Sequence, residues 1–385
     1  MATVTPLHKN ILLVAGDISG DLHACSLMRE LKKADPDVNL TAIGGPRMKA
    51  HADNFIFDLA SMGSNGFIAP LKKMPLWMGL IKQIRQYMET QNPCAIIVVD
   101  FYGFNHQVLN MAKRRGIPTY YYVTPQVWAS RQYRAKQLAR LTKKMYVIYP
   151  FETDFHKKFG GNAVFLGNPL LDIIPKTPEK QFPKQEDAKY YNWKLGILPG
   201  SRHSEISRLM PVFYQAFKRV VKEFPNTQAY VFALPDANEQ HLLSYLGEAP
   251  HANFHIIKDV DYQMRGQMDF LLACSGTATL ENALLGMPMV VAYKLSWATY
   301  HIAKAVIKVS YISLVNLLAN KPIVKELIQA DANPDALAAE AMSMFQNPIK
   351  LVAQREELLK LRASLGKKGV AARAAKDILA DMVKK

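Results

Sequence analysis

A run of small and acidic residues follows the first apolar segment of the chain, and its composition suits contact with a ligand. The run reads Ala15-Gly16-Asp17-Ile18-Ser19-Gly20-Asp21 and follows Ile11–Ala15. Glycines at a turn from a strand to a helix let backbone N–H groups approach an anion, and Ser19 or Asp21 can cap the next helix. The run does not match the dinucleotide pattern GxGxxG. It is either a ligand-binding turn or a capped tight turn, and Gly44-Gly45-Pro46 has the same two interpretations.

A carboxylate, Asp100, comes directly after the apolar run Ala95–Val99, and Asn105 follows it. The carboxyl end of a parallel strand is where open α/β sheets bind their ligands. Asp100 is therefore a candidate general base. The alternative is that it caps the next helix.

Aromatic and basic side chains are concentrated between residues 120 and 140. Tyr120-Tyr121-Tyr122-Val123-Thr124-Pro125-Gln126-Val127-Trp128 is followed by Arg131, Arg134, Lys136 and Arg140. Rings beside cations can stack on nucleic-acid bases. The simpler interpretation is a buried strand followed by a solvated basic helix.

Two glycine turns in the second half of the chain suit phosphate groups. Leu198-Pro199-Gly200-Ser201-Arg202 precedes Glu205, and a glycine turn with a hydroxyl and an arginine can bind a diphosphate. Ser275-Gly276-Thr277-Ala278-Thr279-Leu280-Glu281 is the stronger signal, because small residues around Gly276 expose amides at a helix N-terminus. Glu281 can accept hydrogen bonds from ribose hydroxyls. An ordinary capped helix is the alternative for each turn.

Metal and covalent chemistry are poorly supported. His251 and His255 are four residues apart without a third ligand, so we expect no metal site. Ser201 lies outside a GxSxG elbow, and no GxxxxGK[ST] P-loop occurs. The three cysteines are too widely spaced for a disulfide framework or a CxxC site, which fits a reducing cytoplasm.

Short apolar runs, many of them β-branched, alternate with segments long enough for crossover helices. This pattern predicts parallel α/β sheets with ligands at the carboxyl ends of the strands. The expected strands are Ile11–Ala15, Leu40–Ile43, Ala95–Val99, Thr119–Val123, Lys144–Ile148, Leu195–Leu198, Ala229–Ala233, Asn253–Ile257, Phe270–Ala273 and Met289–Ala292.

The chain of 385 residues is long enough for two domains at about 150 residues each. The segment from Pro169 to Asn192 carries several prolines and charges without periodicity, which marks it as a linker. We expect a first domain over 1–169, a second over 170–344 and a helical tail over 345–385 that packs back on the first domain. The ligand site is expected in a cleft between the two domains.

The charge balance points to an anionic partner. Lysine and arginine number 48 against 32 acids, for a formal net charge of +16. Such a balance suits a nucleic acid, an anionic membrane or a phosphorylated substrate. No recognised nucleic-acid module supports the first of these.

The segment from Phe67 to Met88 combines apolar residues with Lys72, Lys73, Lys82 and Arg85, and it is the longest apolar stretch. It is too interrupted to span a bilayer, and no secretory signal is expected at the N-terminus. Exposed apolar groups edged by lysines suit an anionic bilayer surface. The alternative is a core helix. The expected membrane or acyl-chain contacts are Phe67, Leu71, Met74, Leu76, Trp77, Met78, Leu80 and Ile81.

Taken in order, these motifs resemble those of the bacterial lipid-A-disaccharide synthases, which are inverting glycosyltransferases of the GT-B fold. The matching stretches run from about residue 10 to 330. They are AGDISGD at 15–21, GGPRM at 44–48, MG at 62–63, Asp100 with Phe104-Asn105, TPQVWA at 124–129, Arg131, Arg134, Pro150-Phe151-Glu152, LPGSR with Glu205, SGTATLE at 275–281, PMVVAYK at 288–294, SLVNLLAN at 313–320 and KELIQ at 325–329.

The chain departs from the family pattern mainly in its first half. Asp17 stands where the family usually has Glu, and Gly103 where it has a second Asp. Further departures are Ser64-Asn65-Gly66-Phe67, Ser130, Asn168 and Val315. Because the donor-side motifs are nearly intact, the resemblance speaks more firmly for the nucleotide-sugar donor than for the acceptor.

The resemblance implies a reaction between UDP-2,3-diacylglucosamine and 2,3-diacylglucosamine 1-phosphate that forms the lipid A disaccharide 1-phosphate and UDP. Asp100 would be the base, and no cofactor or divalent metal is implied. The donor would be bound by Arg202, Ser201, Ser275, Gly276, Thr277, Thr279, Glu281, Asn316, Glu326 and Gln329. The acceptor would be bound by Asp17, Ser19, Asn105, Gln126, Trp128 and Arg131. The expected location is the cytoplasm, peripheral on the inner face of the bacterial inner membrane, as a monomer or homodimer.

Two other classes of function remain open from the sequence. A UDP-sugar 2-epimerase shares the fold and similar donor motifs, but needs a pair of acids or histidines around the sugar ring. A non-catalytic protein that binds a nucleotide sugar or a lipid would bind UDP yet release none.

Overall fold

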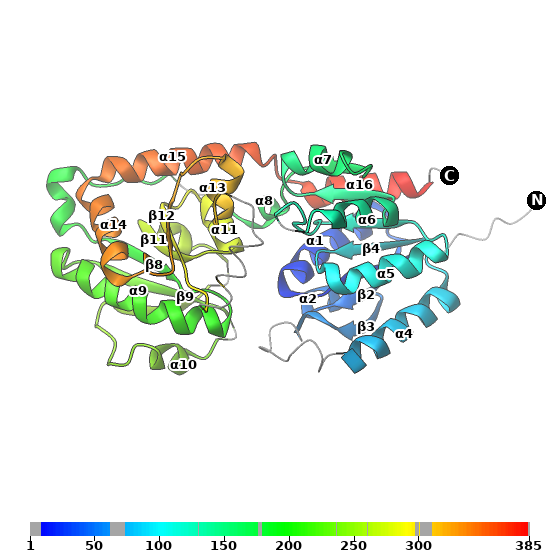
Figure 1. The fold of residues 1–385 in the computed structure, drawn as a ribbon, viewed down its shortest axis with the longest axis horizontal. Coiled ribbons are helices and arrows are strands. Elements are labelled where there is room, and N and C mark those ends of the chain that lie inside the picture. Colours follow the sequence, from blue (N-terminus) through cyan, green and yellow to red (C-terminus); the bar gives the residue numbers. More distant parts are fainter. Residues whose placement is uncertain are drawn as a thin grey trace, which may run out of the picture. The chain divides into compact units, whose positions relative to one another are not determined.

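The computed structural model describes residues 9–61, 74–129, 131–175, 179–235, 237–259, 261–296, 300 and 310–383. The chain forms two compact units (Figure 1). Unit 1 comprises Met1–Asp172 and Leu365–Lys385, and unit 2 comprises Ile173–Ser364. The sequence predicts a first boundary at residue 169 and a helical tail from 345 that packs back on the first domain. The helix α15 (Pro348–Ser364) instead belongs to unit 2, and α16 (Val370–Val383) to unit 1.

Unit 1 is built on a seven-stranded parallel sheet with the strand order β3-β2-β1-β4-β5-β6-β7. Its strands are β1 (Asn10–Ala15), β2 (Asn39–Gly44), β3 (Asn54–Asp58), β4 (Ala95–Val99), β5 (Thr119–Tyr122), β6 (Lys144–Val147) and β7 (Ala163–Phe165). Its helices, besides α16, are α1 (Ile18–Ala34), α2 (Pro46–Lys49), α4 (Met74–Gln91), α5 (Tyr102–Arg114), α6 (Tyr133–Leu141), α7 (Pro150–Lys157) and α8 (Leu170–Ile173).

Alternate residues of each central strand of unit 1 serve two separate cores, as the period of two in a strand requires. Ile11 and Leu13 of β1 pack with residues of α1 and α16. Leu12 and Val14 pack instead with residues of α4, α5 and α6. The sheet is therefore covered on both faces, and its central strands are apolar throughout because both faces are buried.

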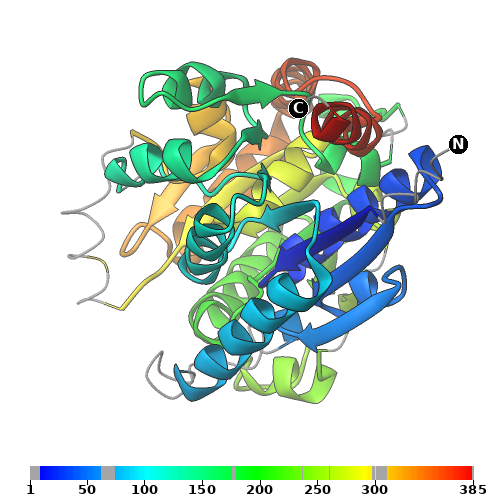
Figure 2. The same ribbon diagram turned by 90° about the vertical axis from the view of Figure 1, so that its right-hand side faces the viewer.

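The last helix, α16, lies beside α1 on unit 1 (Figure 2). Two tyrosines of the sheet donate hydrogen bonds to it: Tyr120 Oη to Asp381 at 2.9 Å and Tyr146 Oη to Asp377 at 2.7 Å. Asp172 accepts from the backbone of Gly369 at 2.5 Å, at the start of this helix. The end of the chain is thus held on unit 1 by buried apolar contact and by charged hydrogen bonds.

Unit 2 repeats the arrangement with the strand order β10-β9-β8-β11-β12-β13, again parallel. Its strands are β8 (Lys194–Leu198), β9 (Gln228–Ala233), β10 (Phe254–Lys258), β11 (Phe270–Cys274), β12 (Met289–Tyr293) and β13 (Lys325–Ile328). Its helices, besides α15, are the 3-10 helices η2 (Gln185–Tyr190) and η3 (Arg265–Gln267), with α9 (His203–Glu223), α10 (Glu239–Ser244), α11 (Thr277–Leu284), α13 (Leu314–Ala319) and α14 (Pro334–Gln346).

The α/β fold class with two Rossmann-like parallel sheets is confirmed. All ten expected strands are present, and β3, β7 and β13 are added at the edges of the sheets. No helix in the described part of the chain is long and apolar enough to cross a membrane.

Candidate active site

The strand order of unit 1 reverses direction between β1 and β4. The chain passes from β1 outward to β2 and β3, and from β4 outward to β5, β6 and β7. Ligands of such sheets bind in the crevice outside the carboxyl ends of the strands at this switch point. Asp17 follows β1 and Asp100 follows β4, so the topology brings these two carboxylates to the same place.

Asp100 begins a backbone turn in the left-handed region. Its φ is 41°, and that of Phe101 is 47°. The turn is held from both sides, because Asn105 Nδ2 donates to the carbonyl oxygens of Val99 at 3.1 Å and Asp100 at 2.7 Å. Tyr121 Oη donates to the Asp100 carbonyl at 2.5 Å. Backbone conformations of this kind cost free energy and persist where the surrounding structure enforces them, often at functional sites.

The charge state of Asp100 is altered by its surroundings. Burial raises the pKa of its carboxyl to about 7, and the nearby Asp17 carboxylate adds to the effect. Burial also raises the pKa of Asp17, whose carboxylate accepts a hydrogen bond from Gly20 N at 2.6 Å. A carboxyl group with a pKa near neutrality is well suited to proton transfer at physiological pH.

The ring of Phe101 fills the space above the first glycine turn. A Cβ atom on Gly16 would lie 1.9 Å from this ring, so no larger residue fits at position 16. Trp77 of α4 meets the rings of Phe101 and Phe104 edge-on, with centroids 6.1 and 5.8 Å apart. The turn that carries Asp100 is therefore packed between the first glycine turn and α4.

The acidic residues of the first motif are engaged by backbone amides. Asp17 is the N-cap of α1. Asp21 is 1% exposed, and its carboxylate accepts from Gly45 N at 2.8 Å and Met48 N at 3.0 Å at the start of α2. The two glycine motifs are thus joined by one buried carboxylate. The motif does cap a helix, but the cap of α1 is Asp17 and not Ser19 or Asp21 as predicted. Ser19 is exposed.

Two residues expected to contact the acceptor are buried instead. Asn105 is fully buried and holds the Asp100 turn. Trp128 is 8% exposed, and its Nε1 donates to Glu152 at 2.9 Å. In this structure their polar N–H groups bond inside unit 1, so the predicted acceptor contact has no support for either residue. Gln126 and Arg131 are exposed and remain candidates.

In unit 2 the switch point lies between β8 and β11, and a basic residue stands there. Arg202 follows β8, and its side chain is 72% exposed. Glu205 of α9 accepts from Ser201 N at 3.1 Å and Arg202 N at 3.2 Å, and pairs with the Arg202 guanidinium at 2.8 Å. The backbone amides of Ser201 and Arg202 are therefore occupied by this glutamate, and the Arg202 side chain is the group that can reach an anion.

The turn after β11 offers free amides. Among the described residues, no hydrogen bond occupies the N–H groups of Gly276, Thr277 and Ala278 at the start of α11. Ser275 Oγ donates to the carbonyl of Ile312 at 3.1 Å. Thr279 is fully buried and its Oγ1 donates to Gly276 O at 2.7 Å, so the prediction that it contacts the donor is wrong in this structure.

Glu281, further along α11, is held by an arginine that the sequence did not single out. Arg265 Nη1 lies 2.8 Å from Glu281 Oε2, and Arg265 also pairs with Asp259. The side chain of Glu281 is 18% exposed. No spacing rule links residue 265 to 281, so the fold alone brings them together.

Three other residues expected on the donor side hold loops together. Asn316 is 1% exposed and bonds to the backbone of Val324 and to Glu326. Glu326 also accepts from Ile312 N at 2.9 Å and Ser313 N at 3.0 Å. Gln329 bonds to both backbone polar groups of Leu295. The predicted donor contact of Asn316 thus has no support in this structure. Glu326 and Gln329 have side-chain oxygens that accept hydrogen bonds from the backbone.

The expected membrane segment falls partly outside the described residues. Phe67 and Leu71 lie there, as does the side chain of Met74. Leu80 is 3% exposed and belongs to a core of unit 1, so the prediction of a surface contact is wrong for it. Trp77 and Ile81 pack against the same core, and Leu76 is half-buried. Met78 is 69% exposed and is the clearest candidate for such a contact.

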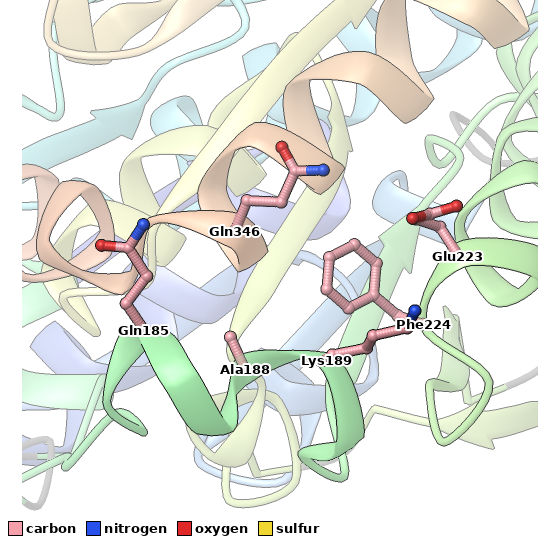
Figure 3. A pocket seen from close by; sticks show the side chains of 6 residues that line it. All are labelled: Gln185, Ala188, Lys189, Glu223, Phe224 and Gln346. Atoms are coloured by element: carbon pink, nitrogen blue, oxygen red, sulfur yellow. The ribbon is translucent and has the colours of Figure 1, made fainter.

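No group of three potential metal ligands occurs among the described residues. A surface hollow of about 260 Å³ lies in unit 2 and is shown in Figure 3. It is lined by Gln185, Ala188, Lys189, Glu223, Phe224 and Gln346. Glu223 ends the 21-residue helix α9 that begins beside Arg202, so the hollow lies about 30 Å from the switch point. It is therefore separate from the candidate active site.

A family model described as lipid-A-disaccharide synthetase matches residues 11–380. The chain belongs to this family. Similar members include the lipid-A-disaccharide synthase of Nitrosococcus oceani, which is 35% identical over 92% of both chains. The lipid-A-disaccharide synthase of Syntrophus aciditrophicus is 36% identical over 95% of this chain and 96% of that protein. The resemblance seen in the motifs is confirmed.

Solved structures of similar fold include a UDP-N-acetylglucosamine 2-epimerase described as putative, from Listeria monocytogenes, with a TM-score of 0.66 and 12% identity over 98% of this chain and 97% of that one. MurG of Acinetobacter baumannii gives a TM-score of 0.61 at 15% identity over 97% and 99%. At these identities the likeness shows the fold alone, which is of the GT-B type. The sequence relatives decide the family. The protein is therefore a glycosyltransferase of lipid A biosynthesis. The epimerase and non-catalytic alternatives are not favoured.

Proposed function

We propose that the chain joins UDP-2,3-diacylglucosamine to 2,3-diacylglucosamine 1-phosphate. The products are the β(1→6)-linked disaccharide 1-phosphate and UDP. The observation that carries the reaction is the family match over residues 11–380, together with relatives that cover more than nine-tenths of the chain. A UDP-sugar donor and a glycosyl acceptor follow from the family, and the acyl groups are the finer part of the proposal.

Asp100 acts as the general base in this proposal. Its carboxylate takes the proton of the acceptor 6-hydroxyl as that oxygen forms a bond to C1 of the donor sugar. The bond between C1 and the UDP oxygen breaks on the opposite face, so the configuration at C1 is inverted and the electron pair leaves with UDP. The raised pKa, to about 7, supports the assignment, because the group can both accept a proton and lose it at neutral pH. Asp17 and Ser19, with exposed Gln126 and Arg131, are proposed to surround the acceptor.

Unit 2 is proposed to stabilise the departing diphosphate. Negative charge develops on its oxygens as the bond breaks, and groups fixed in advance around that charge lower the barrier. Arg202 supplies an exposed guanidinium, and the first turn of α11 supplies the amides of Gly276 and Thr277 with the positive end of the helix dipole. With this compensation the proposal requires no cofactor or divalent metal.

The enzyme is proposed to work at the inner face of the bacterial inner membrane, because acyl tails cannot pass freely through water. The formal charge of +16 favours an anionic surface, at roughly 1 kcal/mol for each basic residue near it. Exposed Met78 on α4 is the apolar part of this contact that the structure describes. The proposal holds for a monomer or a homodimer.

A UDP-release assay with purified protein and both acylated substrates tests the reaction. UDP and the disaccharide should be formed in equal amounts, and neither should form when the acceptor is left out. A protein that binds UDP but releases none would be the non-catalytic alternative. Conversion of the donor sugar without an acceptor would instead identify an epimerase.

A further inference from the structure

Arg265 lies at the centre of a buried charged cluster in unit 2. Its side chain is 8% exposed and belongs to η3, between β10 and β11. Its Nη1 donates to Glu281 Oε2 at 2.8 Å and to Asn282 Oδ1 at 3.3 Å, and its Nη2 donates to Asp259. The guanidinium also lies over the ring of Tyr262, 4.9 Å from the centroid. One cation thus joins the loop after β10 to helix α11.

The cluster fixes the orientation of Glu281 while leaving half of its carboxylate free. Oε2 is bound by Arg265, whereas no hydrogen bond within the described residues reaches Oε1. The planar guanidinium has donors in fixed directions, so it restricts a carboxylate more than a lysine would. Glu281 follows the free amides of Gly276 and Thr277 along the same helix. A fixed carboxylate oxygen close to an anion-binding turn can accept hydrogen bonds from the sugar that carries the phosphates.

We infer that Arg265 is a positioning residue for the donor, which holds Glu281 so that its free oxygen accepts hydrogen bonds from the ribose hydroxyls of a nucleoside diphosphate. The inference rests on the proposed function and deepens it. It assigns to Arg265 an effect on ribose recognition that is separate from any effect on folding. The second acidic partner, Asp259, pairs with Nη2 of the same guanidinium, whereas Glu281 pairs with Nη1.

The test compares the affinities for UDP and 2′-deoxy-UDP by calorimetry, since only the first carries both ribose hydroxyls. The wild-type protein should prefer UDP by about tenfold, the worth of roughly one hydrogen bond to a charged group. Glu281→Ala should abolish the preference. Arg265→Met should lower it to below threefold, while binding of 2′-deoxy-UDP changes less. Asp259→Asn is the matched control, because it alters the same cluster but should keep the preference.

Arg265→Lys covers the case in which Arg265→Met fails to fold. An ammonium group keeps the charge but cannot hold Asp259 and Glu281 in the fixed geometry of a guanidinium, so the preference should again fall, with a melting temperature close to that of the wild type. If the folded Arg265 variants keep the full preference while Glu281→Ala loses it, the inference is overturned. If Glu281→Ala keeps it too, the ribose contact itself is wrong and the inference falls with it. A wild-type protein that binds no UDP would instead overturn the proposed function.

Discussion

Units 1 and 2 share one topology but carry opposite charges at their switch points. In unit 1 the strands adjacent to the reversal are followed by Asp17 and Asp100, and burial together with the nearby Asp17 carboxylate raises the pKa of Asp100. In unit 2 the equivalent strands are followed by Arg202 and by a turn with free amides. The same fold therefore supplies a place for a base in one unit and for an anion in the other, and the residues that follow the strands make the difference.

The two units also use a glutamate in the same way with different results. Glu152 in unit 1 and Glu205 in unit 2 each reach back to backbone amides at the start of a helix. Glu152 is fully buried against Trp128, and burial raises its pKa to about 7. Glu205 instead pairs with exposed Arg202. A helix cap thus stabilises an aromatic loop in unit 1 and orients a cation in unit 2.

Replacing the base should give the largest effect and test the role of unit 1. Asp100→Asn keeps the shape but cannot accept the proton, so the rate of UDP release should fall by about 10²–10⁴-fold. Binding of the UDP donor, which we assign to unit 2, should be unchanged by calorimetry. Asp154→Asn, at an exposed position of α7, serves as the control and should keep full activity. An Asp100→Asn variant within threefold of the wild-type rate would remove Asp100 from the mechanism.

Replacing the cation should give the next largest effect and test the role of unit 2. Arg202→Ala removes a charge-assisted contact with the diphosphate, so UDP affinity, turnover or both should drop by roughly 10–100-fold. The fold should persist, because Glu205 keeps its bonds to the two backbone amides. Arg219→Ala, at the far end of the same helix, is the matched control. Equal UDP affinity and turnover in both variants would identify Arg202 as an ordinary surface residue.

A chelator separates this charge compensation from metal chemistry. Because Arg202 and the α11 amides supply the positive charge in our proposal, EDTA should leave the wild-type rate unchanged. Clear inhibition that is reversed by added Mg²⁺ would contradict the metal-free mechanism.

The dependence of stability on pH gives a smaller effect, and it tests the buried carboxyl of unit 1. The folded-state pKa of Asp100 is raised from 3.8 to about 7, so folding favours the protonated form. Its contribution to stability is therefore full below pH 3.8 and is lost as the pH rises to about 7. Asn cannot lose a proton, so Asp100→Asn should melt above the wild type at pH 8, by roughly 2–4 °C for each kcal/mol gained. The difference in melting temperature between the variant and the wild type should be smaller at pH 5. An equal difference at both pH values would show that Asp100 does not cause the pH dependence of stability.

The sheets could be predicted from the sequence because buried parallel strands are apolar on both faces. All ten such runs form strands, whereas β3, β7 and β13 were missed. These three lie at sheet edges and are only partly buried. Polar residues interrupt β3 and β13, and β7 is only three residues long, so the sequence signal of each is weak. The division of the tail was also missed, since the composition of a helix does not show which of two units it packs on.

The sequence could predict which residues follow the central strands, but not what each side chain contacts. Asp100 and Arg202 do follow strands at the switch points of the two sheets, and their roles stay predictions. A motif does not show whether a polar side chain faces a ligand or the protein's own backbone, and Asn105, Trp128 and Asn316 face the protein. Arg265 was missed because its partners are brought together only by the fold.

The smallest expected effect concerns α4 of unit 1, which carries the exposed apolar residue that we assign to the membrane contact. Met78 is 69% exposed, whereas Leu80 on the same helix is buried in the core. Burial of a methionine side chain in lipid is worth about 1.5–3 kcal/mol at most. Met78→Ser should therefore lower binding to phosphatidylglycerol vesicles several-fold in co-sedimentation while leaving the melting temperature unchanged.

Leu80→Ser is the contrasting variant, and it should lower the melting temperature because it places a hydroxyl in the core. Since neutral phosphatidylcholine vesicles remove the attraction to the basic residues, they should bind the wild type weakly. Equal binding of the wild type and Met78→Ser to the anionic vesicles would show that this end of α4 does not touch the membrane.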